Sequence, residues 1–248
     1  MNKNFAPVID FIIELGECIR YSQTQIILSD QKDIKLKTDK ELHEKIVSFL
    51  LKSYPYKILS EEDEYNASYT KYENPFWIID PLDGSLNFSR DIPISCISIA
   101  LWNKDSVEFG CIYDFNRKEI FVSNNNIFLI NDIPGKTSIT KSTDKGILCS
   151  GFPSWRNYDD DSLKLFLKKI QNWKKIRAIG SAALSLTWVA RGWVDAYIEE
   201  DIRIWDVAAG LAMVKASGGK VYLNENKRSN FVTAIATNGI ISIENLLL

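Results

Sequence analysis

The sequence predicts a layered fold that combines α+β and α/β organisation. Apolar residues recur at helical spacing near the start of the chain, short β-rich runs follow one another from Phe76 to Val122, and helices then alternate with strands. The chain has 248 residues, of which 46% are hydrophobic, and this is enough to bury the core of one large domain. We therefore expect a single domain over residues 1–248, in which residues 1–135 and 136–248 form two closely packed halves.

Two amphipathic helices are expected in the first part of the chain. The first follows Pro7, and the second begins at a capping box in which Thr38 is the N-cap and Glu41 lies three residues further on. Asp39 then falls in the first turn of the second helix. The apolar stripes of the two helices are Val8, Ile12, Leu15 and Ile19, and Leu42, Ile46, Phe49 and Leu50.

The middle of the chain changes to short strands. Asn, Asp, Gly and Arg-Lys turns separate the β-rich runs, a pattern typical of an antiparallel meander. The expected strands are 77–80, 94–102, 107–114 and 119–122.

Strands and helices alternate in the second half, as is typical of α/β organisation. The expected strands are 147–150, 175–179, 194–199, 220–223 and 233–237, and the expected helices are 162–170, 181–190 and 206–216. Ser181 is expected to be the N-cap of its helix. No internal repeat, low-complexity segment or flexible linker interrupts the chain, so we expect the two halves to share a rigid interface.

Composition narrows the functional classes. Thirty basic and 32 acidic residues, without a cluster of basic and aromatic residues, disfavour binding to a nucleic-acid polymer. Cys18, Cys96, Cys111 and Cys149 lack metal-binding spacing, which is typical of an intracellular, reduced protein. Acidic residues interrupt the first apolar segment, so we expect neither a signal peptide nor a membrane span there. We expect a cytoplasmic protein that does not bind membranes.

The stretch Trp77–Pro93, WIIDPLDGSLNFSRDIP, places two carboxylates at the end of an apolar strand. In isolation, such a segment is more typical of a capped turn or an ordinary strand connection. Here Pro81 keeps Asp80 extended, and Gly84 lets the backbone approach a ligand closely. Asp80 and Asp83 beside open backbone amides would suit a Mg²⁺ ion shared with a phosphate group, because Mg²⁺ prefers oxygen ligands.

Three other segments offer oxygen ligands, and each has a simpler interpretation. Glu61 and Glu62 follow two apolar residues, in a segment that could equally be a solvated acidic run. Asp206 stands at the start of a helix of small residues, where it could be only an N-cap. Asp39 could be only a surface carboxylate that stabilises its helix dipole.

Together these segments resemble the inositol monophosphatase family, within the superfamily of Mg²⁺-dependent, lithium-sensitive phosphomonoesterases. The family's first signature, W-x-x-D-P-[LI]-D-G-[TS]-x-N-F, matches residues 77–88, and its second, W-D-x-A-A-G, matches residues 205–210. Its Glu-Glu pair matches Glu61-Glu62, and its Thr-Asp helix start matches Thr38-Asp39. The resemblance runs from about Phe5 to about Asn238. It implies the sugar phosphatase fold, with alternating α-β-α-β-α layers.

The resemblance implies a site for two Mg²⁺ ions. Glu61, Asp80 and the carbonyl of Leu82 would bind the first ion. Asp80, Asp83 and Asp206 would bind the second ion. Two metal ions could then polarise the phosphoryl group and hold the entering and leaving oxygens.

The resemblance also implies roles in catalysis and phosphate binding. Ser85 would hydrogen-bond the attacking water, and Asp39 would orient the Ser85 hydroxyl. The backbone amides of Gly84 and Ser85 would bind phosphate at a helix N-terminus. Ser85 stands where the family usually has Thr, which keeps the hydroxyl but lacks the methyl group that restricts χ1.

Substrate recognition is assigned by resemblance mainly to the second half of the chain. Ala182 lies in the segment Gly180–Ala183, which matches the family's G-[ST]-A-A. Glu199 matches the family's position for a carboxylate that contacts substrate hydroxyls, as do Asp83 and Asp206. By itself, Glu199 could belong to a wholly solvated acidic cluster.

One segment departs from the family. Before Asp39 the family often has a mobile loop that carries a lysine, with a Ser-Pro-x-Asp-Leu-Val pattern, whereas this chain has Ser29 to Ile34. Whether Lys32 is the counterpart of that lysine, and whether a third Mg²⁺ binds there, stays open.

We expect a Mg²⁺-dependent phosphomonoesterase that acts on a small phosphorylated polyol or sugar resembling inositol 1-phosphate. A 3′(2′),5′-bisphosphate nucleotidase and a fructose-1,6-bisphosphatase share the core motifs. Nucleotidases tend to have Lys-Glu-Phe where this chain has residues 86–88, Leu-Asn-Phe, which favours the first possibility over a nucleotide substrate. A regulatory or binding protein that kept the fold is the non-enzyme alternative, and retention of every matched ligand argues against it.

Two other kinds of site are disfavoured, and a homodimer is expected. A Ser-His-Asp triad and a zinc site both need more than the single histidine, His43, which we expect on the surface of a helix. The family resemblance implies a homodimer. Three aromatic residues that we expect to be exposed would suit an interface: Trp155, Tyr158 and Trp173.

Overall fold

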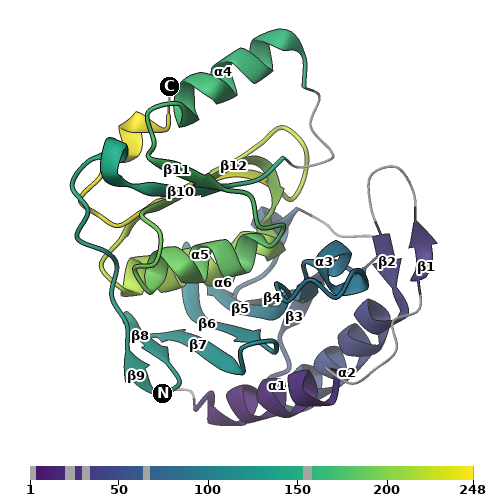
Figure 1. The fold of residues 1–248 in the computed structure, drawn as a ribbon. Coiled ribbons are helices and arrows are strands. Elements are labelled where there is room, and N and C mark those ends of the chain that lie inside the picture. Colours follow the sequence, from purple (N-terminus) through teal and green to yellow (C-terminus); the bar gives the residue numbers. More distant parts are fainter. Residues whose placement is uncertain (1–3, 20–25, 30–33, 64–67, 153–157, 248) are drawn as a thin grey trace.

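The computed structural model describes residues 4–19, 26–29, 34–63, 68–152 and 158–247, and within them helices and sheets alternate in five layers (Figure 1). Helices α1 and α2 cover one face of a seven-stranded sheet. Helices α5 and α6 lie between this sheet and a five-stranded sheet, and α4 lies on the outer side of the smaller sheet. The predicted α-β-α-β-α layering is confirmed.

Helix α1 (Ala6–Ile19) confirms the first predicted helix, since the four residues of its expected stripe are all buried. Helix α2 (Lys37–Ser53) begins one residue before Thr38, and Leu36 is its N-cap. The predicted N-cap role of Thr38 is therefore wrong. The carboxylate of Asp39 closes the helix start instead, because its Oδ2 accepts a hydrogen bond of 2.6 Å from the Leu36 amide.

The seven-stranded sheet has the order β3-β4-β5-β6-β7-β8-β9, and only β3 and β4 run parallel. The predicted meander is confirmed by β4 to β7, whereas β3, β8 and β9 were not predicted. Strands β1 (Ile26–Ser29) and β2 (Ile34–Leu36) form a separate hairpin. The strands of the large sheet are β3 (Lys57–Ser60), β4 (Phe76–Asp83), β5 (Cys96–Asn103), β6 (Ser106–Asp114), β7 (Glu119–Asn124), β8 (Ile127–Ile130) and β9 (Ile133–Pro134).

The five-stranded sheet has the order β11-β10-β12-β14-β13, with β10 parallel to both of its neighbours. Every strand predicted in this half is present. They are β10 (Ile147–Ser150), β11 (Lys175–Arg177), β12 (Ala196–Arg203), β13 (Lys220–Glu225) and β14 (Phe231–Thr237). The chain also forms the short helix α3 (Ser85–Ser89) and 3₁₀ turns at Tyr69–Lys71, Thr143–Lys145 and Ile243–Asn245.

The helices of the second half are α4 (Asp160–Ile170), α5 (Ala182–Ala190) and α6 (Ile204–Ala216). Ser181 is the N-cap of α5 as predicted, and its Oγ accepts from the Leu184 amide at 3.2 Å. Helices α4 and α6 each begin two residues earlier than predicted. Asp206 is consequently the third residue of α6, so the interpretation of Asp206 as an N-cap is wrong.

Helices α5 and α6 are buried on nearly all sides because each packs against both sheets. Small residues allow the two helices to approach closely. A Cβ atom on Gly210 of α6 would lie only 2.5 Å from the Cβ of Leu186 of α5. The middle layer therefore fixes the start of α6, which carries Asp206, against the end of strand β4.

The three aromatic residues that were expected to be exposed have different outcomes. Trp173 is 7% exposed and packs in a core cluster against the smaller sheet, so its predicted exposure is wrong. Tyr158 is half-buried beside Phe152, and Trp155 lies outside the described residues.

The four cysteines are free thiols. Among the described residues, no helix is long and apolar enough to cross a membrane.

We predict that Ile12→Ala lowers the free energy of unfolding by about 2–5 kcal/mol, because Ile12 is fully buried between α1 and the large sheet. Ile139→Ala is the matched control, since Ile139 is 80% exposed and its loss should change stability by no more than about 0.5 kcal/mol. Guanidinium denaturation of the three proteins measures both values. Equal losses in the two variants would contradict the packing of α1.

Candidate metal centre

The end of strand β4 directs both aspartates of the DPLD segment to the same side of the sheet. Between Asp80 and Asp83 the register with β5 shifts, since Asp80 pairs with Ser98 and Asp83 with Cys96. This bulge inserts one extra residue, so two side chains three residues apart face the same layer. Leu82 packs on the opposite face, against the layer of α1 and α2.

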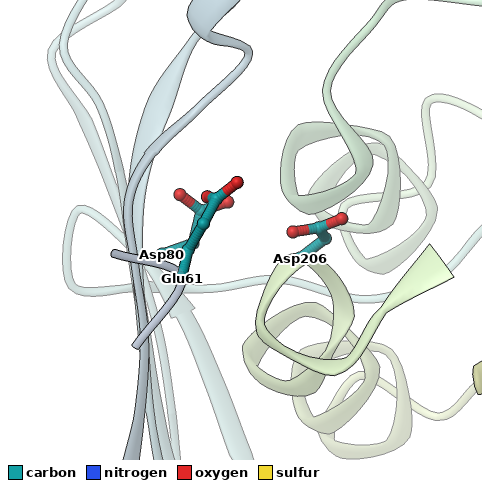
Figure 2. Close-up of side chains that lie close together, drawn as sticks. All are labelled: Glu61, Asp80 and Asp206. Carbon is teal, nitrogen blue, oxygen red and sulfur yellow. The ribbon is translucent and has the colours of Figure 1, made fainter. Parts of the chain in front are cut away.

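Glu61 and Asp206 complete a group of carboxylates around Asp80 (Figure 2). One carboxylate oxygen from each of the three residues lies within 4.8 Å of the others. Glu61 follows β3, which runs parallel to β4, and its amide donates to the Ile79 carbonyl at 3.2 Å. Asp206 reaches the group from the first turn of α6. Because Glu61 is half-buried and faces this group, its interpretation as a solvated residue is wrong.

The electrostatics of this group favour a bound cation. Burial raises the pKa of Asp80 well above its usual value, and the charges of Glu61, Asp83 and Asp206 raise it further. Burial likewise raises the pKa of Asp206, with Glu61 as the next cause. The donors are all carboxylate oxygens, which are hard ligands. A divalent cation of the Mg²⁺ type would compensate their charge, so the residues fit such an ion.

Asp83 lies beside this group but is also held by α5. Among the described residues, the group that lies within 4.8 Å does not include Asp83. Its Oδ2 accepts from the Ser181 hydroxyl at 2.5 Å and from the Ala183 amide at 2.8 Å. Burial raises the pKa of Asp83 to about 6, although these hydrogen bonds act in the opposite direction. Asp83 thus joins the end of β4 to the start of α5.

Ser85 and Asp39 are in contact, as the family resemblance implied. The Ser85 hydroxyl lies 3.1 Å from Asp39 Oδ1 and 2.8 Å from the Leu82 carbonyl. Asp39 is 4% exposed, so its interpretation as a surface carboxylate is wrong. The Leu82 amide in turn donates to Asp80 Oδ1 at 3.0 Å. A chain of short contacts therefore links Asp39 to the carboxylate group.

Gly84 shapes the turn between β4 and α3. Its φ of +87° lies in the left-handed region, and a Cβ atom there would lie 2.7 Å from the Ile94 carbonyl oxygen. Glycine is therefore required at this position. It is the N-cap residue of α3, so the amide of Ser85 lies at the start of this short helix.

Glu199 is largely removed from solvent, contrary to the solvated alternative. The Tyr197 hydroxyl donates to Glu199 Oε2 at 2.9 Å, and a Cβ atom on Gly151 would overlap Glu199 Oε1. Burial raises the pKa of Glu199 to about 7. Its neighbour Glu200 pairs with the buried Lys169 at 2.5 Å. Glu199 lies near enough to Asp83 for the charge of Asp83 to raise its pKa further.

The sequence did not predict two contacts that assemble the site. Ser181 was expected only to cap α5, but its hydroxyl also binds Asp83. The side-chain Nδ2 of Asn87 donates to the carbonyls of Ile94 and Ile179, at 2.9 and 2.8 Å, and so connects α3 to the segment before α5. The place of Asn87 in the first signature was the available signal. Lys32, and with it the question of a third metal ion, lies outside the described residues.

Comparisons with known proteins agree with this geometry. Residues 10–242 match the inositol monophosphatase family. The inositol-1-monophosphatase of Synechocystis sp. is 34% identical over 222 residues, which are 86% of this chain and 75% of that protein. The Nus factor SuhB of Escherichia coli strain K12 is 32% identical over 81% of this chain and 77% of that protein.

Solved structures share the fold along almost the whole chain. The extragenic suppressor protein SuhB from Bartonella henselae superposes with a TM-score of 0.82 and 28% identity, over 97% of this chain and 95% of that one. The Thermotoga maritima IMPase superposes with a TM-score of 0.80 and 27% identity, over 97% of this chain and 94% of that one. The chain therefore belongs to the inositol monophosphatase family. Membership supports a phosphatase, and the family is metal-dependent.

We predict that Glu199→Gln raises the Tm of the chelator-treated protein at pH 8 but hardly changes it at pH 4. The folded-state pKa of Glu199, about 7, lies above the value of 4.5 for a free glutamate. Its contribution to stability is therefore fully present below about pH 4.5 and is lost as the pH rises through about 7. Glutamine stays neutral and avoids this loss.

Thermal unfolding at the two pH values measures this effect, and Glu14→Gln on the exposed side of α1 is the control. A Tm difference between parent and Glu199→Gln that is the same at both pH values would contradict the assigned pKa.

Proposed function

We propose that this protein is a Mg²⁺-dependent phosphomonoesterase that hydrolyses a small polyol or sugar phosphate resembling inositol 1-phosphate. The observation that carries the proposal is the convergence of Glu61, Asp80 and Asp206, joined through Leu82 to the Ser85–Asp39 pair. The proposed catalytic unit is one domain over residues 1–248, in which residues 1–135 bind metal and phosphate and residues 136–248 contribute to substrate recognition.

The metal ligands in this proposal come from both halves. Glu61, Asp80 and the Leu82 carbonyl would hold one Mg²⁺, and Asp80, Asp83 and Asp206 would hold a second. When bound, the two ions would supply Lewis-acid stabilisation of the phosphoryl group and lower the pKa of a water molecule. Asp83 can contribute one oxygen while its Oδ2 stays with α5, because a carboxylate has several acceptor positions.

Ser85 and Asp39 act on the attacking water. Asp39 accepts a hydrogen bond from the Ser85 hydroxyl, which leaves the Ser85 oxygen free to accept one from a water molecule and to fix its direction. Both oxygens of Asp39 have partners, since Leu36 holds the other, so Asp39 is itself held in place. The amides of Gly84 and Ser85 bind the phosphate.

Substrate recognition is proposed for the surface where the two halves meet. Ala182, Glu199, Asp83 and Asp206 would contact hydroxyl groups of the alcohol. Glu199 suits this role because it is held by Tyr197 and its pKa lies near 7, so it can donate or accept. A relative named inositol-1-monophosphatase supports a polyol substrate. Nucleoside bisphosphates and fructose bisphosphate are the alternative substrates.

A second candidate is a regulatory or binding role on the same fold. Relatives whose name is Nus factor SuhB, including the one from Escherichia coli strain K12, favour it. We propose that the protein is a homodimer, whichever of the two functions it has. Phosphate release distinguishes the two candidates.

We predict that the purified protein releases phosphate from at least one of inositol phosphates, sugar phosphates, fructose bisphosphate and adenosine bisphosphate when Mg²⁺ is present. Excess chelator should abolish release, and Asp206→Asn should lower kcat by about 10²-fold or more, because it removes a proposed metal ligand rather than core volume. Millimolar lithium should inhibit.

Asp161→Asn is the matched control, since the Asp161 side chain is 95% exposed on α4. It should keep the parental kcat. Full turnover in chelator, or parental kcat in Asp206→Asn at saturating Mg²⁺, would contradict the metal-dependent mechanism. A folded, Mg²⁺-binding protein without activity on any of these compounds would support the second candidate.

We predict that Ser85→Ala and Asp39→Asn each lower kcat by about 10²-fold, and that the double variant is little slower than the slower single variant. The two residues orient one water molecule, and residues that act as a unit give non-additive losses. Ser85→Thr should keep activity because it retains the hydroxyl and restricts χ1.

The measurement is kcat at saturating Mg²⁺ and substrate. Ser89→Ala is the control, because the Ser89 hydroxyl donates to the Leu86 carbonyl of its own short helix, at 2.8 Å. Losses that multiply in the double variant, or parental kcat in Ser85→Ala, would mean that Asp39 serves only its helix.

A further inference from the structure

His43 is not on the surface as predicted but lies between α2 and the turn that carries Glu61. Its side chain is 17% exposed. Its Nδ1 lies 2.8 Å from the Ser60 hydroxyl oxygen, and its Nε2 lies 3.7 Å from Asp63 Oδ1. Ser60 directly precedes Glu61, and Asp63 follows two residues later. One imidazole therefore contacts the turn on both sides of the proposed metal ligand.

The turn that carries Glu61 is also held by backbone hydrogen bonds. Strand β3 ends at Ser60, and beyond it the amide of Glu61 donates to Ile79 at 3.2 Å. The amides of Glu62 and Asp63 donate to the hydroxyl and carbonyl oxygens of Ser60, at 3.4 and 3.3 Å. Ser60 is fully buried, and its hydroxyl contacts both the Glu62 amide and the His43 ring.

The hydrogen bonds are consistent with one tautomer of His43. The Ser60 hydroxyl donates to Nδ1, while its oxygen accepts from the Glu62 amide. The hydrogen on Nε2 then faces the carboxylate of Asp63. The ring therefore contacts Ser60 through Nδ1 and faces Asp63 through Nε2.

Helix α2 gains a second function from this contact. Asp39 and His43 are four residues apart and lie on the same side of the helix. Asp39 holds Ser85 after β4, and His43 holds Ser60 at the end of β3. One helix therefore fixes both the proposed water-orienting hydroxyl and the proposed metal-ligand turn.

We propose that His43 is a positioning residue that, through Ser60, aims the Glu61 carboxylate at the metal centre and so sets the affinity for Mg²⁺. This inference rests on the proposed function, because it takes Glu61 to be a metal ligand. Groups that orient metal ligands in this way affect metal affinity by roughly 10- to 100-fold when they are removed.

The test is a calorimetric titration of the full-length protein with Mg²⁺, together with kcat at saturating Mg²⁺. His43→Ala and Ser60→Ala should each weaken Mg²⁺ binding by about tenfold. The double variant should be no more than about twofold weaker than the weaker single variant, because both changes remove the same contact. The loss of kcat at saturating Mg²⁺ should be smaller than the loss of affinity.

His43→Asn tests whether the hydrogen bond to Ser60, rather than the volume of the imidazole ring, sets the Mg²⁺ affinity. The Asn oxygen can take the place of Nδ1 and accept from Ser60, so this variant should restore Mg²⁺ affinity to within about threefold of the parent. Glu44→Ala, the exposed next residue of α2, is the control and should bind Mg²⁺ as the parent does. Ser60→Ala removes a single oxygen and tests the contact even if His43→Ala does not fold.

Parental Mg²⁺ affinity in both alanine variants would overturn the inference, as would an Asn variant as weak as His43→Ala. Losses that multiply in the double variant would also overturn it. A parent that binds no Mg²⁺ would overturn the proposed function and this inference together. A parent that binds Mg²⁺ but releases no phosphate would contradict only the proposed activity, and the calorimetric comparison would still decide the role of His43.

Discussion

The burial of several carboxylates in one place is the constraint on which the site depends. Asp80 and Asp83 are 1% and 7% exposed, and Glu61 and Asp206 approach them from two other elements. Like charges removed from water repel one another strongly and cost several kcal/mol each unless they are compensated. The raised pKa values of Asp80 and Asp206 express that cost. Protons or a bound cation must therefore offset the repulsion among these carboxylates in the folded protein.

The fold holds this unfavourable group together with large apolar layers on both sides. Strands β3 and β4 run parallel, so their carboxyl ends deliver Glu61 and Asp80 side by side. The β4 bulge adds Asp83, and α6, packed between the two sheets, brings Asp206. Because α6 contacts both sheets, Asp206 cannot move away from Asp80 without disturbing the largest core of the protein.

Two contacts connect the group to the rest of the site. Asp83 accepts from the start of α5, which carries Ala182, one of the proposed substrate contacts. Asp39 and His43 reach the site from α2 on the other side of the large sheet. The residues of the site therefore lie on, or directly beside, helices and strands, which suits a reaction that depends on positioning.

Periodicity predicted most of the fold, and its errors have physical causes. The stripe of α1 and the alternating runs of β4 to β7 are long enough to be read directly. Strands β8 and β9 are short and surrounded by Asn and Asp, which usually indicate a turn. The start of α2 was misplaced because the Asp39 carboxylate, which accepts from the Leu36 amide, took the place of the expected Thr38 cap.

The linear motifs predicted the candidate site better than its supporting contacts. Asp80 and Asp83 are only three residues apart in the sequence, so one segment indicated both. Ser181 lies 98 residues from Asp83, and Ser60 lies 17 residues from His43, so only the folded chain brings these pairs together. The same holds for the burial of Glu199 and Trp173, which charge and local composition alone did not indicate.

The central claim is that Glu61, Asp80 and Asp206 form one cation site. The most direct test is an anomalous difference map from a crystal of the protein soaked in Mn²⁺, a heavier ion that also accepts carboxylate ligands. The account predicts a peak in direct contact with oxygens of all three residues. A fully occupied peak elsewhere, with none among these carboxylates, would contradict it.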